Sequence, residues 1–404
     1  IDTPGYFDFE GEVAQALRVA DCGVIVVSAK NGASVGTEKA WKAMKDCGKP
    51  TMFYISKLDE EHANYFETLD ALRDTFGATV VPFSFPILNG EQAVGIVDVL
   101  AKKAYDVSGK EIALPADAEE KIEEYMMSIN EQVAETDEEL MEKFFMEEEF
   151  DEHEIARGLR IGVKSGEIRP VYCGSADKGT GIERILDLIT EYFPSYAEKG
   201  SIRGTNAKGD PIEMETNENE AMSAFVFKSV IDPFVGKISY LKVMSGVLTS
   251  DSQIYNSTKE CNEKVSQVYV INGKYQVGVG KLFTGDIGAV VKLQNTQTND
   301  TLCTSSRVVK YPPIEYPQPM LGYAVWPKTK ADEDKMSVGI RNMCEEDGTI
   351  KLVKNAETHE QVLYVMGDQH IDLIISKLKS KYKVEVTTTV PTVQYRETIR
   401  GKSE

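Results

Sequence analysis

The chain has 404 residues, of which 42% are hydrophobic, and a formal net charge of -20. This length predicts a soluble protein of two to four domains, and no apolar run approaches the roughly 20 residues that a membrane-spanning helix needs. The start lacks a signal-peptide pattern, and the six cysteines are scattered without a CxxC pair, which argues against a zinc knot or a disulfide framework and fits a reducing cytoplasm.

The first region, residues 1–195, alternates apolar runs of strand length with helical stretches. This alternation is typical of a parallel sheet covered by helices, and so of an α/β fold. The expected strands lie at 24–27, 52–55 and 171–173, and the expected helices at 37–45 and 182–192.

The stretch between the second and third expected strands, about 86–169, is too long for an ordinary loop. We therefore expect an inserted helical subdomain there. Within it, residues 116–154 hold 17 Asp or Glu and only two Lys. Such a segment is usually the solvated face of helices, and the alternative is a docking site for a basic partner.

The rest of the chain changes pattern twice. Residues 196–220 are rich in Gly, Asn, Lys and Glu and are predicted to be a linker. Short, regularly spaced strands over 221–310 predict a small antiparallel β-barrel. Residues 317–390 follow the order strand, helix, two strands, helix, strand, which predicts a ferredoxin-like split βαβ domain, and 391–404 begin a further domain.

The chain opens on IDTPG, which suits the sensing of a phosphate group. Gly5 has no side chain, so its backbone N–H can approach a γ-phosphate oxygen closely. Asp2 can hold Mg²⁺ through water. Alone, the four residues DTPG are a weak signal, because a plain turn explains them as well.

Two further short motifs follow apolar strands, at 56–59 (SKLD) and 174–176 (GSA). The Asp59 carboxylate can accept both the ring N–H and the amino group of guanine, and Lys57 can lie along the base. The small residues of the second motif allow a backbone N–H to reach guanine O6. Open α/β sheets bind ligands at the carboxyl ends of their strands, so we expect these motifs and DTPG to form one site.

With these motifs in that order, the chain resembles elongation factor G and its close translational GTPase relatives. IDTPGYFDFEGEVAQALRVADCGVIVV resembles the family's switch II and the strand after it. DPFVGKISYLKVMSGVL and DTLC resemble the translation-factor barrel, while WPKTKADEDKM, MGDQHIDLII and YRETI resemble the third domain and the entry to the fourth. The similarity covers essentially the whole chain.

The resemblance implies a P-loop GTPase-type domain, a translation-factor β-barrel and a ferredoxin-like third domain. It implies GTP or GDP with Mg²⁺ as ligands, and ribosome-activated GTP hydrolysis in translation elongation. Residues Asp2, Thr3, Pro4 and Gly5 would contact the phosphate and metal, and Ser56, Lys57, Asp59, Gly174, Ser175 and Ala176 would contact the base. The implied partners are ribosomal RNA and the stalk proteins, with no membrane. We expect a cytoplasmic monomer.

Three departures from the family pattern stand out. The phosphate loop and switch I, expected before Ile1, are absent from the sequence given, so we expect a part of a longer protein. Tyr6 occupies the position of the family's water-positioning His, and a phenol cannot take up a proton near pH 7 as imidazole can. Ser56 replaces the usual Asn of the guanine motif. Tyr6 could instead pack beneath the following helix, beside Phe7.

Two other functions remain open from the sequence. One is a ribosome-protection relative that ejects an antibiotic. The other is a ribosome-binding module with weak or no GTPase activity, which Tyr6 and Ser56 favour and the intact Asp59 disfavours. Four lysines near the end of the third domain's second helix are the best local candidates for contacts with ribosomal RNA phosphates, namely Lys377, Lys379, Lys381 and Lys383.

Overall fold

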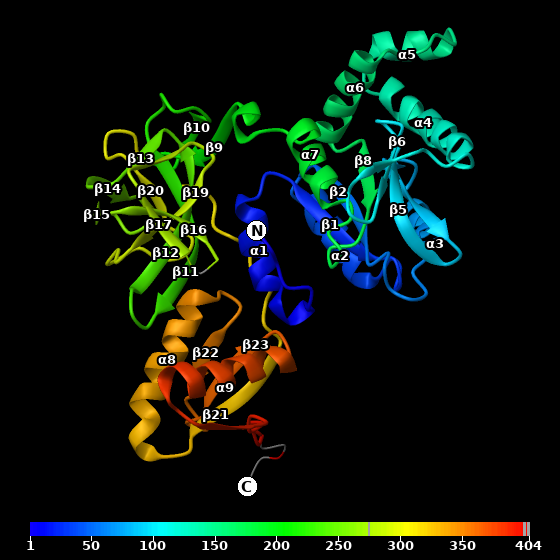
Figure 1. Cartoon of the computed structure of the whole chain (residues 1–404). Helices are drawn as coiled ribbons and strands as arrows, with labels where there is room; N and C mark the ends of the chain where they lie inside the picture. The colour runs from blue at the N-terminus through cyan, green and yellow to red at the C-terminus, as the bar shows by residue number, and fades with distance from the viewer. Residues whose placement is uncertain (274, 399–400, 402–404) are drawn as a thin grey trace. The chain divides into compact units, whose positions relative to one another are not determined.

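The computed structural model describes residues 1–273, 275–398 and 401, which form two compact units (Figure 1). Unit 2 is the continuous segment Ala20–Ser195, whereas unit 1 combines Ile1–Val19 with Tyr196–Glu404. Unit 1 is thus assembled from two segments that lie far apart in the sequence. Among the described residues, no helix is both long and apolar enough to cross a bilayer.

Unit 2 is built on a four-stranded parallel sheet of order β1-β2-β8-β3, which confirms the α/β prediction. Its strands and the three helices of this part are β1 (Gly23–Ser28), α2 (Val35–Asp46), β2 (Thr51–Ser56), α3 (Tyr65–Phe76), β3 (Val80–Pro82), β8 (Arg169–Cys173) and α7 (Ile182–Tyr192).

Strand β2 lies inside this sheet, and all six of its residues are buried. Its continuous apolar run is what a strand covered on both faces requires. On one side the Phe53 ring stacks with Trp41 and Phe76, at centroid distances of 6.0 and 5.4 Å. Helix α2 begins at a capping box between Ser34 and Thr37, which satisfies the first helical amides.

The insertion differs from the helical subdomain predicted for 86–169. It begins with a four-stranded antiparallel sheet, and only then do helices follow. The elements are β4 (Ser84–Asn89), β5 (Gln92–Asp98), β6 (Lys103–Asp106), β7 (Glu111–Ile112), α4 (Ala118–Ala134), α5 (Glu138–Phe145) and α6 (Glu152–Ser165). The buried Asp98 carboxylate fastens the sheet to α7, because it accepts hydrogen bonds from Arg184 at 2.9 and 2.7 Å.

The central part of unit 1 is an antiparallel barrel domain, as predicted. An eight-stranded sheet of order β15-β14-β20-β11-β12-β19-β16-β17 and the pair β13·β18 bury one apolar core. The strands are β11 (Ser223–Asp232), β12 (Gly236–Ser245), β13 (Val247–Thr249), β14 (Ser252–Asn256), β15 (Cys261–Val265), β16 (Val268–Asn272), β17 (Tyr275–Val279), β18 (Lys281–Phe283), β19 (Ile287–Val291) and β20 (Thr301–Cys303).

The segment predicted as a linker, 196–220, has regular structure instead. It contains a short 3-10 helix, η2 (Tyr196–Lys199), and a hairpin of β9 (Ser201–Thr205) with β10 (Pro211–Glu215). Met214 from this hairpin is fully buried among side chains of the barrel. Ile202 and Ile212 of the hairpin pack against the same cluster, so a few apolar residues dock the hairpin although its composition resembles a loop.

The third domain has the predicted order of elements and a sheet of order β22-β23-β21-β24. The elements are β21 (Leu321–Pro327), η3 (Lys330–Asp332), α8 (Glu333–Glu346), β22 (Lys351–Lys354), β23 (Gln361–Val365), α9 (Asp368–Tyr382) and β24 (Val386–Thr389). Of the predicted entry to a further domain, 391–398 carry no strand. Residues 399, 400 and 402–404 lie outside the described residues.

The N-terminal helix of unit 1 is held at its start by the third domain. This helical segment consists of η1 (Phe7–Phe9) and α1 (Glu10–Val19). The Asp8 carboxylate accepts the backbone N–H of His370 at 3.1 Å, at the amino end of α9. His370 in turn lies 3.2 Å from the Asp347 carboxylate. A carboxylate at a helix N-terminus is stabilised by the unpaired amides there, so Asp8 caps α9 from outside that helix.

The other end of α1 is held by the barrel. Lys242 on β12 is only 1% exposed, and its ammonium donates to the carbonyl oxygen of Val19 at 2.8 Å. The same ammonium lies 4.0 Å from the centre of the Tyr196 ring. Nearby, the Arg18 guanidinium lies over the Phe225 ring at 4.3 Å. A cation at the carboxyl end of a helix complements the free carbonyl groups there.

The contact between Asp8 and α9 predicts a specific steric conflict at Gly367. A Cβ atom on Gly367 would overlap both carboxylate oxygens of Asp8. We expect Gly367→Ala to lower the free energy of unfolding of unit 1 by about 1–3 kcal/mol, the usual cost of overpacking. Denaturant unfolding followed by hydrogen exchange at the start of α9 measures this.

Gly280→Ala is the matched control, because nothing lies within 4 Å of its added Cβ. In the background of Asp8→Ala, the Gly367→Ala change should cost much less, since the opposing oxygens are gone. If Gly367→Ala lowers the free energy of unfolding equally in the wild-type and Asp8→Ala backgrounds, the proposed conflict with the Asp8 carboxylate is wrong.

Candidate functional site

Residues 56–59 and 174–176 lie together at one edge of the parallel sheet of unit 2. Strands β2 and β8 are parallel neighbours, with Ile55 opposite Cys173, so the two motifs leave the sheet side by side. The backbone N–H of Leu58 donates to the carbonyl oxygen of Gly174 at 3.4 Å. The two loops that were predicted to read a base are therefore joined directly.

Asp59 is exposed and, within residues 1–273, 275–398 and 401, its carboxylate accepts no hydrogen bond. It borders a small hollow that Ser175 and Lys178 also line. Its lining also includes apolar side chains, among them Ile96 of β5 and Val107. An unpaired carboxylate beside a partly apolar wall is able to accept two N–H donors from a flat polar ring.

The loop after β8 uses most of its own backbone donors. The N–H of Gly174 donates to Ile55 at 3.0 Å, and the N–H of Ser175 donates to Thr180 at 3.1 Å. Among the described residues, the N–H of Ala176 has no partner, and Ala176 is exposed. Of the three residues predicted to donate a backbone N–H to a base oxygen, only Ala176 therefore has an unpaired N–H among the described residues.

Lys57 has a left-handed backbone, with φ of 66°, and its side chain is held locally. Its ammonium lies 2.8 Å from Glu60, which also lies 3.2 Å from Lys30. The hydrogen bond with Glu60 is the main cause that raises the pKa of Lys57. Sequence patterns gave no sign of Glu60, because an ion pair three residues apart on an exposed turn looks like any surface charge.

Ser56 does not face the loop. Its side chain is buried and its hydroxyl donates to the carbonyl oxygen of Val27 on β1 at 3.4 Å. Behind it, the Tyr54 hydroxyl donates to the carbonyl oxygen of Thr180, also at 3.4 Å. Burial raises the pKa of Tyr54, and the nearby Cys173 and Asp59 add to this effect. These hydroxyl groups brace the two loops from inside and stay uncharged.

The residues predicted to sense the phosphate belong to unit 1. Asp2, Thr3, Pro4 and Gly5 are exposed and have no regular secondary structure. Tyr6 is 64% exposed at the start of η1. The alternative in which Tyr6 packs beneath the following helix is therefore wrong, because the side chain is largely in solvent.

Asp2 would need help to hold a metal. In the part of the chain that the structure describes, no three His, Cys, Asp or Glu side chains are grouped to bind a metal ion. Mg²⁺ is commonly held by one or two carboxylates together with substrate phosphates and water. One exposed aspartate fits that mode and does not fit a site made by the protein alone.

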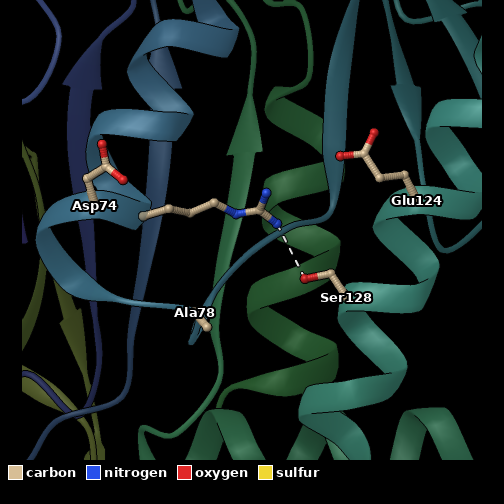
Figure 2. Close-up of a pocket in the computed structure, with 5 residues that line it drawn as sticks. Asp74, Ala78, Glu124 and Ser128 are labelled. Carbon is tan, nitrogen blue, oxygen red and sulfur yellow. Dashed lines mark hydrogen bonds between the residues drawn. The ribbon is translucent and has the colours of Figure 1, made fainter.

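A larger hollow of about 380 Å³ lies between α3 and α4, and no sequence pattern indicated it (Figure 2). The Arg73 guanidinium projects into it and donates to Ser128 at 3.3 Å and to the carbonyl oxygen of Val80 at 3.2 Å. Asp74 and Glu124 also line the hollow (Figure 2). With two carboxylates and only one guanidinium in its lining, the hollow is unsuited to a phosphate group.

The four lysines proposed for RNA contacts are partly engaged within the protein. Lys379 lies 3.0 Å from Glu385, and Lys381 lies 2.9 Å from Glu346. Lys383 donates to the carbonyl oxygen of Ser380 at 2.8 Å. These pairs reduce the positive charge that this end of α9 can offer to a polyanion.

The packed loop after β8 leads to a prediction. A Cβ atom on Gly174 would overlap the carbonyl oxygen of Thr180 and come within 2.6 Å of the Tyr54 hydroxyl. We expect Gly174→Ala to destabilise unit 2 by about 1–3 kcal/mol. Urea unfolding monitored by Trp41 fluorescence in a Trp326→Phe background measures it. The exposed Ala176→Ser is the control, with an expected change within about 0.5 kcal/mol. Equal free energies of unfolding for Gly174→Ala and the wild-type protein would show that the loop has room for a Cβ atom at this position.

Three family models match the chain, each over a different domain. Residues 1–195 match the elongation factor Tu GTP-binding domain, 221–305 match elongation factor G domain 2, and 316–390 match elongation factor G domain III. The matches follow one another in the order that the sequence motifs predicted.

A solved structure agrees with this assignment. The crystal structure of ttk003000868 from Thermus thermophilus matches with a TM-score of 0.85 and 30% sequence identity. The match covers 97% of this chain and 57% of that one, so the chain spans little more than half of its relative's length. By its three domains and their order, the chain belongs to the elongation factor G-like translational GTPases.

Proposed function

We propose that this protein hydrolyses GTP on the ribosome and couples hydrolysis to translocation during elongation. The observation that carries the proposal is the base-reading edge of unit 2, where the Asp59 carboxylate and the Ala176 amide are both unpaired among the described residues. They follow adjacent parallel strands, which is where α/β sheets bind ligands.

In this proposal each group has one task. Asp59 accepts the ring N–H and the amino group of guanine, a pair of donors that adenine lacks. The amide of Ala176 donates to guanine O6, and the stem of Lys57 lies along the base. Glu60 pairs with the Lys57 ammonium at 2.8 Å and so restricts where that ammonium lies.

The phosphate end is assigned to the exposed start of the chain. Asp2 would hold Mg²⁺ through water, with Thr3 and Pro4 shaping the turn, and the Gly5 amide would donate to the γ-phosphate. Mg²⁺ would supply charge neutralisation during phosphoryl transfer. Tyr6 would orient the attacking water through its hydroxyl, without acting as a base near pH 7.

The acidic insertion is the proposed contact with the ribosomal stalk. Helices α4, α5 and α6 carry the excess of carboxylates between residues 116 and 154. Some of these are engaged locally, as in the pair Lys143–Glu154 at 2.7 Å, but many others belong to exposed residues. Such a surface steers a basic partner toward it at low ionic strength.

A non-translocating role is the second candidate. Ser56 turns its hydroxyl into the sheet and offers no side-chain amide to the nucleotide loops, which favours a weaker hold on nucleotide. A ribosome-protection protein, or a ribosome-binding module that seldom hydrolyses GTP, would tolerate that loss. Guanine preference and ribosome-stimulated turnover separate a working GTPase from a ribosome-binding module that seldom hydrolyses GTP.

Base selection is tested by Asp59→Asn in the full-length gene product. Losing a charge-assisted, two-point contact should weaken GTP binding by roughly 10²-fold or more and shift preference toward xanthine nucleotides. Calorimetry with GDP and XDP measures both effects. Asp74→Asn, a carboxylate in the other hollow, should leave affinity unchanged. Equal affinity of the wild-type protein for ATP and GTP would refute the assignment.

Turnover is tested by replacing Tyr6. A positioned imidazole typically contributes ~10² to 10⁴-fold to a proton-transfer step, so Tyr6→His should increase ribosome-stimulated GTP hydrolysis. Tyr6→Phe should reduce the rate below that of the wild-type protein, because it removes the hydroxyl that orients water. If Tyr6→His lowers or preserves the rate while nucleotide affinity is intact, Tyr6 is already the effective residue and the proposed role is wrong.

A further inference from the structure

The loop between β8 and α7 is closed by Thr180, to which the proposed function gives no role. Thr180 is only 6% exposed, and its carbonyl oxygen accepts the backbone N–H of Ser175 at 3.1 Å and the Tyr54 hydroxyl at 3.4 Å. A β-bridge joins Ser175 and Thr180 across the base of the loop. Because Ala176 directly follows Ser175, this bridge restricts the position of the unpaired Ala176 N–H.

The side chain of Thr180 leaves the loop and contacts the insertion. Its hydroxyl donates to the carbonyl oxygen of Val107 at 2.9 Å, in the turn between β6 and β7. That turn is held by its own hydrogen bonds, because the Asp106 carboxylate accepts the backbone N–H groups of Ser108 at 2.8 Å and Lys110 at 3.1 Å. The turn therefore offers Thr180 an acceptor in a fixed place.

A second contact ties the same inserted sheet to the helix that follows the loop. The Asp98 carboxylate at the end of β5 is 2% exposed and lies 2.7 Å from Arg184 of α7. The loop is thus held by the insertion at Thr180 and again just beyond its end. Val107 and Thr180 also line the hollow that Asp59 borders, so the first contact lies at the edge of the base site.

We propose that Thr180 is a positioning residue for guanine, which acts through its hydrogen bond to Val107 and holds the Ala176 N–H in place for guanine O6. This role rests on the proposed function, because it requires the base to lie against Asp59 and Ala176. Thr180 itself makes no contact with O6. A purely structural contact would instead affect every nucleotide equally, and that difference makes the role testable.

Thr180→Val in the full-length gene product removes the hydroxyl and keeps the branched shape of the side chain. Calorimetry measures the affinities for GDP, IDP and 6-thioguanosine diphosphate. The thio analogue carries sulfur, a weak acceptor, in place of O6, whereas IDP lacks the amino group that Asp59 accepts. The preference for GDP over the thio analogue therefore reports the Ala176 contact, and the preference for GDP over IDP reports the Asp59 contact.

We expect Thr180→Val to weaken GDP binding by about 3- to 10-fold, the range for one neutral hydrogen bond, and to change the affinity for the thio analogue little. The preference for GDP over the thio analogue should shrink accordingly, while the preference over IDP stays at the wild-type value. Thr180→Ser keeps the hydroxyl and should keep both preferences. The matched control is Thr75→Val, which removes an exposed hydroxyl that donates to Ala71 at 2.7 Å in the same unit and should change neither preference.

A wild-type protein that binds ADP as tightly as GDP would contradict the proposed function, and the role of Thr180 with it. The other refuting results leave guanine binding intact. If the wild-type protein prefers GDP to ADP but binds GDP and the thio analogue equally, the Ala176 N–H does not read O6. If Thr180→Val lowers both preferences alike, lowers neither, or behaves as Thr180→Ser does, the hydroxyl does not position the base.

Discussion

Unit 1 depends on two charged groups placed at the ends of helices. Asp8 supplies a carboxylate to the amino end of α9, and the buried Lys242 supplies an ammonium to the carboxyl end of α1. Both contacts lie where helices leave backbone groups unpaired, so each is stabilised by local amides or carbonyls. Together they fasten α1 to the third domain and to the barrel. The segment that follows the proposed phosphate sensor is thus part of unit 1.

The fold could be predicted where apolar periodicity was strong. The runs that became β2 and β8 are continuous because both faces of the parallel sheet are covered there, and a buried strand tolerates few polar positions. Strand β1, at the edge of the sheet, is also apolar, although Val24 and Val26 are exposed. The short sheet β4–β7 was missed because its first strand contains Pro86, a residue that is unfavourable in strands, and β7 has only two residues. The β9–β10 hairpin was missed because only a few scattered apolar residues, Met214 with Ile202 and Ile212, anchor it.

The site could be predicted in outline, since strand ends locate it, but not in its chemistry. Sequence spacing brought Asp59 and residues 174–176 to one sheet edge, as the pairing of β2 with β8 requires. Sequence spacing could not show that the backbone N–H groups of Gly174 and Ser175 are already hydrogen-bonded, because their partners are the carbonyl groups of Ile55 and Thr180. Backbone hydrogen bonds between distant segments leave no trace in residue types.

The discontinuity of unit 1 has a consequence for synthesis of the protein. Asp8 and the residue whose amide it accepts, His370, are separated by 362 positions. At ~5–20 residues per second, a ribosome needs roughly 20 to 70 seconds to make the second after the first. Unit 2, which is continuous, can fold during that interval. Until the barrel residues that cover Val19 have been made, the apolar side of α1 has no partner, so the nascent chain must keep this helix from aggregating during that time.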